Sequence, residues 1–555
     1  MSQLQQWRLA ITPLSPVHLG TGQDYEPTGY VIDGGILYEF DGIAALQVLP
    51  APERERLGKI LAGIPSDGML RQVQSFFHAN RDRLIAVSRN QVRVNASVEG
   101  FYTERVGRVA QHETGGKVVQ NKLEIQRTAY NPPSGEAIVP GSGLKGAIRT
   151  ALLDAENNGA ALPAELKTRE QHGQGQANRR LQEHLFHYQM RDLDRDPMRL
   201  VRVTDAVLQD AEAFATEVRF AVNRKKQPVR KGEVLLQSQA EQKNLYQLLE
   251  CLPAMRPRAF LGELTIQNDG GLNSRRWPEL RFDLQSIATA CNRFYRPLFE
   301  RELALLQQRG YVEEDWYTSM RALLAGPLRR ALDDHRAFLV RVGRHSGAES
   351  VTLNGVRSIR IMTGNGAKAE YLGDAKTIWL ASYERQAQRK LLPFGWLLVE
   401  PYQVRDTLEQ WTGQIAATDA VAWRSGVRQR QEAARADLLA AQQREAERAR
   451  EAERAKREAE ARAQRLASMS DEARSIAHLR ELFERERAAG RREPGGELAS
   501  MLVDLLKTAE AHWQGSDCAE LADLGVEIST YIGWPAKKKK QQRLALIEAV
   551  RGKSC

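Results

Sequence analysis

The sequence has few cysteines and no long apolar run, and both absences narrow the class of protein. Only four of its 555 residues are cysteines, and none shows Cys-x-x-Cys or Cys/His spacing, so the pattern supports neither a zinc site nor a disulfide framework. No apolar run approaches the roughly 18 residues of a membrane span, and the N-terminus lacks a signal-peptide pattern. These absences predict a soluble protein of the reducing cytoplasm with no bound metal and no membrane partner.

Basic residues outnumber acidic ones. The chain carries 80 Lys and Arg against 70 Asp and Glu, which gives a formal net charge of +10 at pH 7. Such a balance favours a polyanionic partner, with nucleic acid as the first candidate and an anionic membrane as the second. Hydrophobic residues make up 42% of the sequence, and a chain of this length and composition can form two or more domains with real cores.

One stretch combines a glycine turn with two basic residues. Residues 138–150 have the sequence Ile-Val-Pro-Gly-Ser-Gly-Leu-Lys-Gly-Ala-Ile-Arg-Thr, which predicts a short strand, a turn and a helix. A glycine turn before a helix leaves backbone N–H groups free and presents the positive end of the helix dipole to an anion. Lys145 and Arg149 are four residues apart and share a helix face. The stretch therefore predicts a site for a phosphate or a polyphosphate backbone.

This stretch does not fit the known nucleotide-binding loops. A Walker A loop ends in Gly-Lys-Ser/Thr, whereas Lys145 here precedes Gly146 and no Ser or Thr follows. The glycines Gly141, Gly143 and Gly146 match a dinucleotide fingerprint by spacing alone, with a lysine inside it. We therefore expect no cofactor, and a purely structural strand-to-helix turn with solvated bases is the remaining alternative.

Two further segments place glycines beside basic residues or histidine. Residues 18–22, His-Leu-Gly-Thr-Gly, follow a strand predicted over residues 7–19. Residues 343–347, Gly-Arg-His-Ser-Gly, follow a strand that ends near Arg341. Glycine lets another backbone approach closely, while arginine and histidine offer cations and hydrogen-bond donors.

Residues 91–130 carry many bases and few large apolar side chains. The pattern predicts two polar strands joined at Gly115-Gly116, which together form a projecting hairpin; a mobile surface loop is the alternative. The polar stretch 165–180 that follows the predicted helix has no core pattern and predicts another loop. The bases of the first segment are Arg93, Arg105, Arg108, Lys117, Lys122 and Arg127.

The stretch from Pro140 to Thr150 resembles the Pro-Gly-Ser-Ser-Leu-Lys-Gly-x-x-Arg signature of the RAMP superfamily, the RNA-binding subunits of type III CRISPR effector complexes. Gly143 stands where the family usually has Ser. The segments 18–22 and 343–347, together with Pro-Phe-Gly-Trp at 393–396, are most similar to the subunit that caps the crRNA 3′ end in type III-A (Csm) complexes. The resemblance covers roughly residues 1–405 through these short motifs.

The resemblance implies an α+β protein with a ferredoxin-like (RRM-like) domain over residues 1–405, into which a hairpin and helices are inserted. It implies a non-catalytic, structural subunit that holds the crRNA 3′ end and supports crRNA maturation and target RNA binding. The implied partners are crRNA, target RNA, other subunits of the complex and host nucleases that trim crRNA. The candidate RNA-binding residues are His18, Arg105, Lys122, Arg127, Gly141, Ser142, Gly143, Lys145, Gly146, Arg149, Arg341, Gly343, Arg344 and His345.

Two other functions stay open at this point. In the backbone subunits of such complexes, a loop aspartate cleaves target RNA with a divalent metal, so Asp24 or Asp33 could make this chain a metal-dependent endonuclease. Asp33 also lies in an Asp-Gly-Gly turn, where aspartate is favoured for its backbone hydrogen bonds. The other alternative is a scaffold that recruits a partner protein through its C-terminal helices.

The composition changes after residue 405. Residues 406–470 predict a charged helical linker, because 424–465 consist almost wholly of the strong helix formers Ala, Arg, Glu, Gln and Lys. Residues 471–555 predict a small basic helical domain. Its lysine run at 537–540 suits either a nucleic-acid backbone or the solvated start of a helix.

Overall fold

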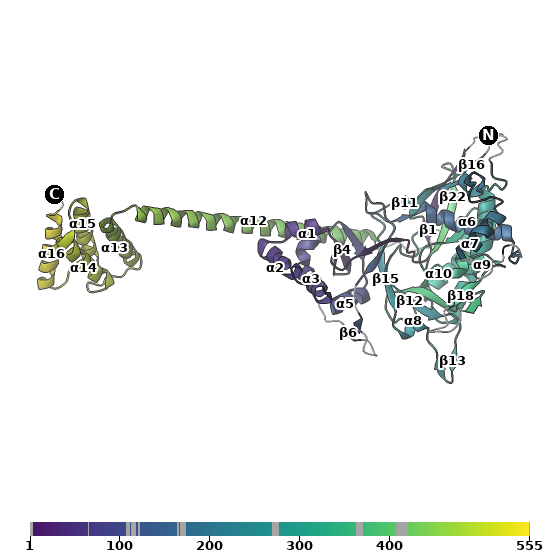
Figure 1. The fold of residues 1–555 in the computed structure, drawn as a ribbon, viewed down its shortest axis with the longest axis horizontal. Coiled ribbons are helices and arrows are strands. Elements are labelled where there is room, and N and C mark those ends of the chain that lie inside the picture. The colour runs from purple at the N-terminus through teal and green to yellow at the C-terminus, as the bar shows by residue number, and fades with distance from the viewer. Residues whose placement is uncertain are drawn as a thin grey trace. The chain divides into compact units, whose positions relative to one another are not determined.

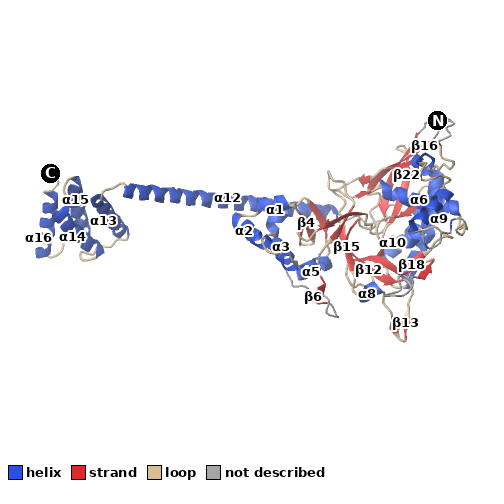
Figure 2. Cartoon of the chain, viewed as in Figure 1, coloured by secondary structure: helices blue, strands red, loops and turns tan. Residues whose placement is uncertain are grey.

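The structure is a computed structural model with two compact units, residues 1–438 and 439–555. Helices and strands both contribute to the first unit, which confirms the predicted α+β class (Figure 2). The residues that the structure describes are 4–64, 66–106, 111–112, 118–119, 123–163, 166, 174–268, 277–361, 370–406, 408 and 420–553.

The first sheet of the first unit is antiparallel throughout. Its strand order is β17-β22-β1-β16-β11-β9, and β10 also pairs with β16. β1 is central, with β16 on one edge and β22 on the other, so its backbone groups are satisfied on both sides. The strands are β1 (Leu4–Pro13), β9 (Ile138–Val139), β10 (Val201–Val203), β11 (Ala206–Leu208), β16 (Phe260–Gln267), β17 (Phe338–Arg341) and β22 (Trp396–Tyr402).

The alternating pattern of β1 predicts one buried face, but Leu9 to Pro13 are all buried. The difference arises because this part of β1 lies in the middle of the sheet and belongs to the large core of the first unit. Phe394 and Trp396 of the Pro-Phe-Gly-Trp segment are also fully buried in that core, so these two side chains have a packing role.

Helices α6 (Gly141–Asn157) and α9 (Leu284–Gln308) pack against each other beside this sheet (Figure 1). The hydroxyl of Tyr295 on α9 donates to the Ala147 carbonyl on α6 at 3.0 Å. Asp283 and Ser286 form a capping box that sets the start of α9. The position of α6 is therefore fixed by core packing along its apolar side, while its first turn stays at the edge of the sheet.

The second sheet is mixed. Its order is β2-β8-β15-β12-β5-β4-β3, with β20 paired to β12 and β21; the β12–β5 and β15–β8 pairs are parallel. The strands are β2 (Gly20–Tyr25), β3 (Tyr30–Asp33), β4 (Ile36–Glu39), β5 (Asn90–Arg93), β8 (Ile125–Thr128), β12 (Glu217–Lys225), β15 (Tyr246–Cys251), β20 (Thr377–Ser382) and β21 (Leu392–Pro393). The β3–β4 hairpin turns at Asp33-Gly34-Gly35, as predicted.

Helices α1–α4 cover a separate core next to β3 and β4, to which Val427 of the long helix α12 (Ala420–Ala467) also contributes. The prediction of strands throughout 91–130 was wrong in part, because Asn95 caps a helix, α5, with its side chain and so starts a helix there. Two short paired strands, β6 and β7, follow α5. These elements are α1 (Gly42–Val48), α2 (Ala51–Leu61), α3 (Asp67–Ala79), α4 (Arg81–Ala86), α5 (Ala96–Arg105), β6 (Gln111–His112) and β7 (Val118–Val119).

Helix α7 (Gln174–Leu185) begins inside the polar stretch 165–180, for which the sequence pattern predicted a loop. Its end packs into the core through Leu181, Leu185 and Phe186, and this tertiary contact outweighs the polar composition. The remaining elements of the first unit are η2 (Leu193–Arg195), η3 (Pro197–Leu200), β13 (Arg230–Lys231), β14 (Val234–Leu235), α8 (Gln239–Gln242), α10 (Glu314–Ala325), α11 (Pro327–Asp333), η4 (Ala348–Val351), β18 (Ile359–Ile361) and β19 (Glu370–Leu372).

The long helix α12 (Ala420–Ala467) begins in the first unit and ends in the second. Its first part packs through Val427, but nearly all side chains after Leu438 are exposed, as their composition predicts. The second unit also contains α13 (Asp471–Ala488), α14 (Glu497–His512), α15 (Ser516–Ile532) and α16 (Lys537–Arg551), which share their own core. Within the described residues, no helix has the length and apolar character that a membrane span requires.

Candidate functional site

The three glycine-rich turns that the sequence analysis identified meet in space. The Arg344 N–H donates to the His18 carbonyl at 2.9 Å. Gly343 has φ +80°, and a Cβ there would lie 2.3 Å from the same carbonyl oxygen, so only glycine fits. The Leu19 side chain would lie 3.4 Å from a Cβ at Gly343 and 4.0 Å from one at Gly143. The turns at 141–146 and 343–347 therefore both lie next to Leu19 of segment 18–22.

The first turn of α6 already contacts a carboxylate of the protein itself. The Gly141 N–H donates to Asp205 Oδ1 at 2.7 Å, so one of the N–H groups predicted to meet a phosphate is already occupied. A Cβ at Gly141 would lie 2.4 Å from the Val203 carbonyl oxygen, whereas one at Gly146 would have no atom within 4 Å. Gly141 is thus needed for backbone contact, while Gly146 and the exposed Ser142 leave an open surface along the helix start.

Arg149 is a structural residue in this arrangement. Its guanidinium donates to Asp196 Oδ2 at 2.9 Å, to the Tyr188 hydroxyl at 2.9 Å and to Gln182 Oε1 at 3.0 Å. The sequence motif predicts that Arg149 binds phosphate beside Lys145. In the structure it instead ties α6 to α7 and to the segment before η3, because a nearby carboxylate satisfies its charge.

Arg341 is likewise engaged inside the protein. It is 6% exposed, its Nε donates to the Phe394 carbonyl at 2.9 Å, and its Nη1 donates to Glu302 at 2.6 Å. The guanidinium also lies 4.9 Å from the ring centroid of Trp396. Arg341 therefore holds β17 against α9 and β22.

Arg127, predicted to lie in the projecting hairpin, belongs to β8 in the second sheet. It is 8% exposed; its Nη1 donates to Glu39 at 3.1 Å, and its guanidinium lies 3.6 Å from the centroid of Tyr130. Of the two other hairpin candidates, Lys122 lies outside the described residues. Arg105 ends α5, and its side chain is likewise outside the described part.

The two histidines of the site are neutral. His18 is 1% exposed and its Nδ1–H donates to the Glu250 carbonyl at 2.7 Å; burial lowers its pKa. His345 shares a hydrogen bond of 2.9 Å with Gln247 and stacks on Trp379. Burial, with smaller contributions from Arg344 and His18, lowers the pKa of His345 to about 3. The expectation of a cation at His345 is therefore corrected, because desolvation disfavours the charged ring.

The lowered pKa of His345 predicts acid sensitivity of the fold. Between pH 6.5 and the folded pKa of about 3, the unfolded chain binds a proton at this ring and the folded chain does not, so stability falls as pH falls. We expect the free energy of unfolding to drop by about 1–2 kcal/mol between pH 6.5 and 5 from this residue. Denaturant titrations at several pH values measure the slope.

The matched comparison for this prediction is His345→Asn against His184→Asn. His184 is an exposed histidine of α7. The first variant should show a shallower loss of stability on acidification than the wild-type protein, and the second should follow the wild-type protein. Identical slopes for all three proteins would contradict the assignment of a neutral, buried His345.

Three cations remain at the surface of the site. Lys145 is half-buried; desolvation lowers its pKa, which Asp196 partly offsets. Arg344 is exposed, and its side chain has no ion pair within the described part of the chain. Arg202 of β10 is exposed and near enough to Lys145 to lower its pKa electrostatically. Arg202 was not predicted from the sequence, although its place between two apolar residues of a strand was a usable signal.

The two candidate catalytic aspartates have different surroundings. Asp33 forms ion pairs with Arg81, at 3.0 Å, and with Arg430 of α12. Asp24 is exposed on β2. No cluster of three or more His, Cys, Asp or Glu side chains suited to a metal ion occurs among the described residues. The two arginines beside Asp33 compete with any metal for its carboxylate.

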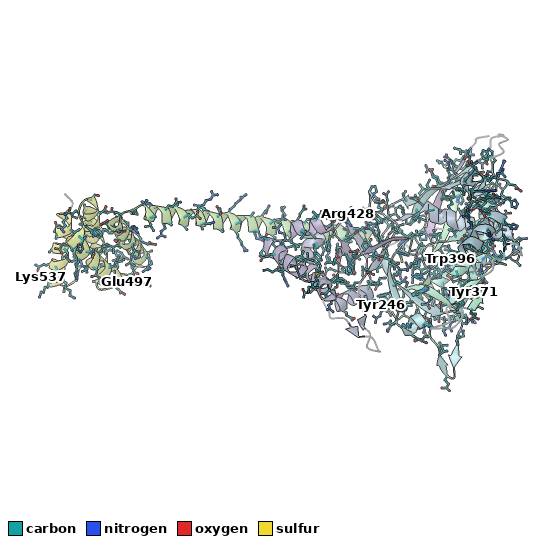
Figure 3. All side chains as sticks on the ribbon, in the orientation of Figure 1. Tyr246, Tyr371, Trp396, Arg428, Glu497 and Lys537 are labelled. Atoms are coloured by element: carbon teal, nitrogen blue, oxygen red, sulfur yellow. The ribbon has the colours of Figure 1, made fainter. Side chains whose placement is uncertain are left out.

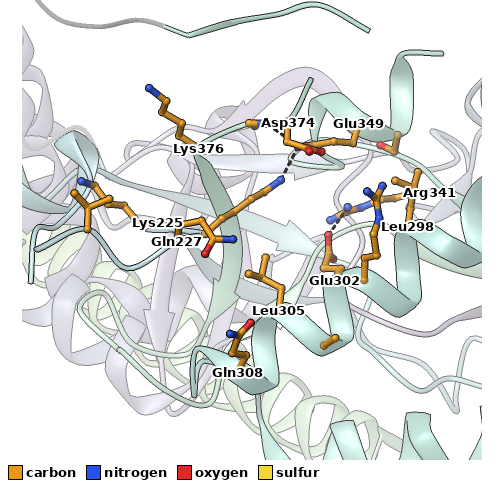
Figure 4. Close-up of a pocket in the computed structure, with 16 residues that line it drawn as sticks. Lys225, Gln227, Leu298, Glu302, Leu305, Gln308, Arg341, Glu349, Asp374 and Lys376 are labelled. Atoms are coloured by element: carbon orange, nitrogen blue, oxygen red, sulfur yellow. Dashed lines mark hydrogen bonds and ion pairs between the residues drawn. The ribbon is translucent and has the colours of Figure 1, made fainter. Parts of the chain in front are cut away.

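A cleft of ≈ 710 Å³ lies between α9, the end of β12 and residues 374–376, with Arg341 and Glu349 in its lining. Glu302 is directed toward Arg341, and Lys376 extends away from both (Figure 4). Lys226 pairs with Glu349 at 2.5 Å across the cleft. A smaller cleft of ≈ 350 Å³ shares this wall and reaches Gly347. Because acids neutralise several of its bases, the cleft is a weaker anion site than the surface around Lys145.

The first unit is thus an α+β protein in which glycine turns bring backbone and exposed bases to one site. Its sequence matches the family model of the RAMP superfamily over residues 10–287, which is 278 of the 555 residues, and the chain belongs to this superfamily.

The structure also resembles solved structures. Csm5 from T. onnurineus, a crystal structure, is 16% identical with a TM-score of 0.39, over 70% of this chain and 99% of that chain. A chain of a type III-A Csm-crRNA-target RNA ternary complex, solved by cryo-EM, is 16% identical with a TM-score of 0.39, over 71% of this chain and all of that chain. No curated protein sequence matches this chain.

Proposed function

We propose that this protein is a crRNA-binding structural subunit of a type III CRISPR effector complex, which caps the crRNA 3′ end and supports crRNA maturation and target RNA binding. Membership of the RAMP superfamily supports an RNA-binding role. The motifs at 18–22, 140–150, 343–347 and 393–396 support the narrower assignment to the 3′-end subunit by resemblance. In this proposal the partners are crRNA, target RNA, other subunits and crRNA-trimming host nucleases.

The observation that carries the proposal is the meeting of the three glycine turns around Leu19, with the half-buried Lys145 and the exposed Arg202 and Arg344 nearby. A Cβ at Gly22 or Gly146 would meet no atom within 4 Å, so a ribose-phosphate backbone can approach the protein closely at these two glycines, and separate cations contact successive phosphates. Such a site recognises a strand by its backbone, with little sequence preference and a steep dependence on salt.

The order of elements supports a ferredoxin-like architecture for the RNA-binding part. Along the chain, β1, α6, β10, β16, α9 and β22 occur in this order, with other elements inserted between them. In space, β22, β1, β16 and β10 are neighbours and pair antiparallel. A βαββαβ chain with this strand order is the ferredoxin-like pattern. We propose residues 1–405 as the RNA-binding domain, 406–470 as a linker and 471–555 as a second domain; the packing of Val427 limits the free part of the linker to residues after Leu438.

In this proposal the chain itself does not cleave RNA. The pairing of Asp33 with two arginines supports this part of the proposal. Incubating the assembled complex with target RNA and Mg²⁺ tests this point: cleavage lost on Asp24→Ala or Asp33→Ala substitution would show that the chain is an endonuclease.

Copurification tests the proposal as a whole. The protein, expressed in cells that contain a type III CRISPR array and purified gently, should carry a small RNA of uniform length with a repeat-derived 5′ end. Sequencing of the bound RNA provides the measurement. Absence of such RNA, or a random mixture of cellular RNA, would contradict the assignment.

A further inference from the structure

Four consecutive lysines form the first turn of α16 in the second unit, and the proposed function gives them no role. They are Lys537–Lys540, all exposed, and the first turn contains no acidic residue. Figure 3 labels Lys537 at this end of the helix. A helix N-terminus carries partial positive charge, so lysines there are unfavourable for the fold. An arrangement that opposes the helix dipole points to a role outside folding.

The neighbouring acids do not neutralise these lysines. Helix α15, which packs against α16, has four acidic residues and no basic one. No ion pair joins any of the four lysines to a carboxylate in the described part of the second unit. The acids of α15 are engaged elsewhere: Glu520 with Arg480 at 3.1 Å, Asp523 with Arg551 at 2.5 Å, Glu527 with Arg487 at 3.5 Å, and Asp517 with the Ser470 hydroxyl at 3.2 Å.

A buried cation lies one turn further along the same helix. Arg543 is 6% exposed, and its Nε and Nη1 have no hydrogen-bond partner among the described residues. Arg543 lies four residues after Lys539 and therefore on the same face of the helix. A buried guanidinium with unused N–H groups is costly. It adds positive charge beneath the lysine turn, where an anion would be stabilised.

An aromatic residue adjoins the same turn. Trp534 is half-buried just before α16, and the Nζ of Lys540 lies 5.5 Å from its ring centroid. An indole beside lysines is a combination that stacks a base while the cations contact phosphates. A membrane is less suitable, because the exposed residues 536–542 present no large apolar side chain, and interfacial helices need an apolar face.

We propose that the first turn of α16, with Trp534 and Arg543, is a second binding site for single-stranded nucleic acid. It is separate from the glycine-turn site of the first unit, which is formed by segments 18–22, 141–146 and 343–347. Successive helical residues are about 100° apart, so the four lysines surround the helix start and can contact phosphates of a strand that passes across it. The lysines of the site bind phosphates and Trp534 stacks on a base, so the site has no sequence preference.

The test uses the full-length protein with all four lysines replaced by glutamine, and a fluorescently labelled single-stranded RNA of about 30 nucleotides whose anisotropy is followed over a salt series. We expect affinity to fall at least about 10-fold, and the slope of log K against log salt to become shallower by roughly 2–3, since each phosphate contact contributes about 0.7. The melting temperature should stay equal or rise, because the substitutions remove charges that oppose the helix dipole. A decrease in both affinity and melting temperature would mean disrupted folding and would overturn the proposal.

The matched control neutralises four exposed bases of α12, through Arg444→Gln, Arg448→Gln, Arg450→Gln and Lys456→Gln. It should leave RNA affinity within about twofold, since only contacting cations release counterions. Equal losses in the two variants, or no loss in the α16 variant, would overturn the proposal. So would competition by polyglutamate or by anionic vesicles as effective as competition by RNA, because the turn would then bind a protein or a membrane.

A combined variant distinguishes RNA binding at this site from RNA binding at the site in the first unit. The α16 substitutions are repeated together with Lys145→Ala and Arg344→Ala. If the sites are distinct, the combined variant should bind RNA more weakly than either single-site variant, because each single-site variant keeps one site intact. If the first-unit pair alone has no effect while the α16 variant loses affinity, the proposed function fails and this inference stands.

Discussion

Replacing Lys145 and Arg344 with alanine should weaken single-stranded RNA binding by roughly 30- to 150-fold, equivalent to about 2–3 kcal/mol for the loss of two charge-assisted contacts. Both side chains lie at the surface of the glycine-turn site. The loss should be equal for unrelated RNA sequences, because phosphate contacts carry no sequence information. The slope of log K against log salt should become shallower by about 1.4, since each contact contributes about 0.7.

Two further variants distinguish loss of contact from loss of charge or fold. Arg54→Ala with Lys59→Ala removes the same charge from exposed positions of α2 and should leave binding nearly unchanged. Arg149→Ala should lower the free energy of unfolding by about 3 kcal/mol, because it leaves Asp196 without its partner. Unchanged affinity of the Lys145/Arg344 variant across the salt series would refute the assigned site.

Replacing Gly141 with alanine should lower the free energy of unfolding by about 3–5 kcal/mol. The added Cβ would lie 2.4 Å from the Val203 carbonyl oxygen and 2.6 Å from the Thr204 carbonyl carbon. These are backbone atoms and cannot rotate away. The helix start would have to shift, which also weakens the hydrogen bond from Gly141 to Asp205. Chemical denaturation of the full-length protein measures the effect.

Gly146 provides the control within the same helix. A Cβ there meets no atom within 4 Å, so Gly146→Ala should stabilise the protein by about 0.5–1 kcal/mol through helix propensity. The two substitutions add the same methyl group five residues apart and should change stability in opposite directions. Similar effects of the two changes would contradict the close backbone approach at Gly141.

Several elements of the site could be predicted from the sequence. The strand at 138–139 and the helix that begins at Gly141 follow from the apolar residues and the glycine turn. The β3–β4 turn and the exposed part of α12 follow from local composition. These features depend on residues that are neighbours in the chain, so local propensity decides them. The position of α5 was missed because its Asn95 cap is a weaker local signal than the basic residues around it.

The roles of the arginines could not be predicted in this way. Arg149 and Arg341 stand in motifs that suit phosphate, yet Asp196 and Glu302 take both side chains into internal ion pairs. Those carboxylates lie 47 and 39 residues away in the chain, and only folding brings them near. Burial likewise makes His345 neutral, although the ring would titrate near neutral pH in an exposed loop.

Residue type and local spacing are enough to predict the basic character of the chain, the glycines that let backbones approach, and the long exposed helix after Leu438. Tertiary structure decided which cations stay available. Lys145, Arg202 and Arg344 remain at the surface around Leu19, and Arg149 and Arg341 do not. The physical reason is that a charge is free only where no distant carboxylate pairs with it and water still reaches it.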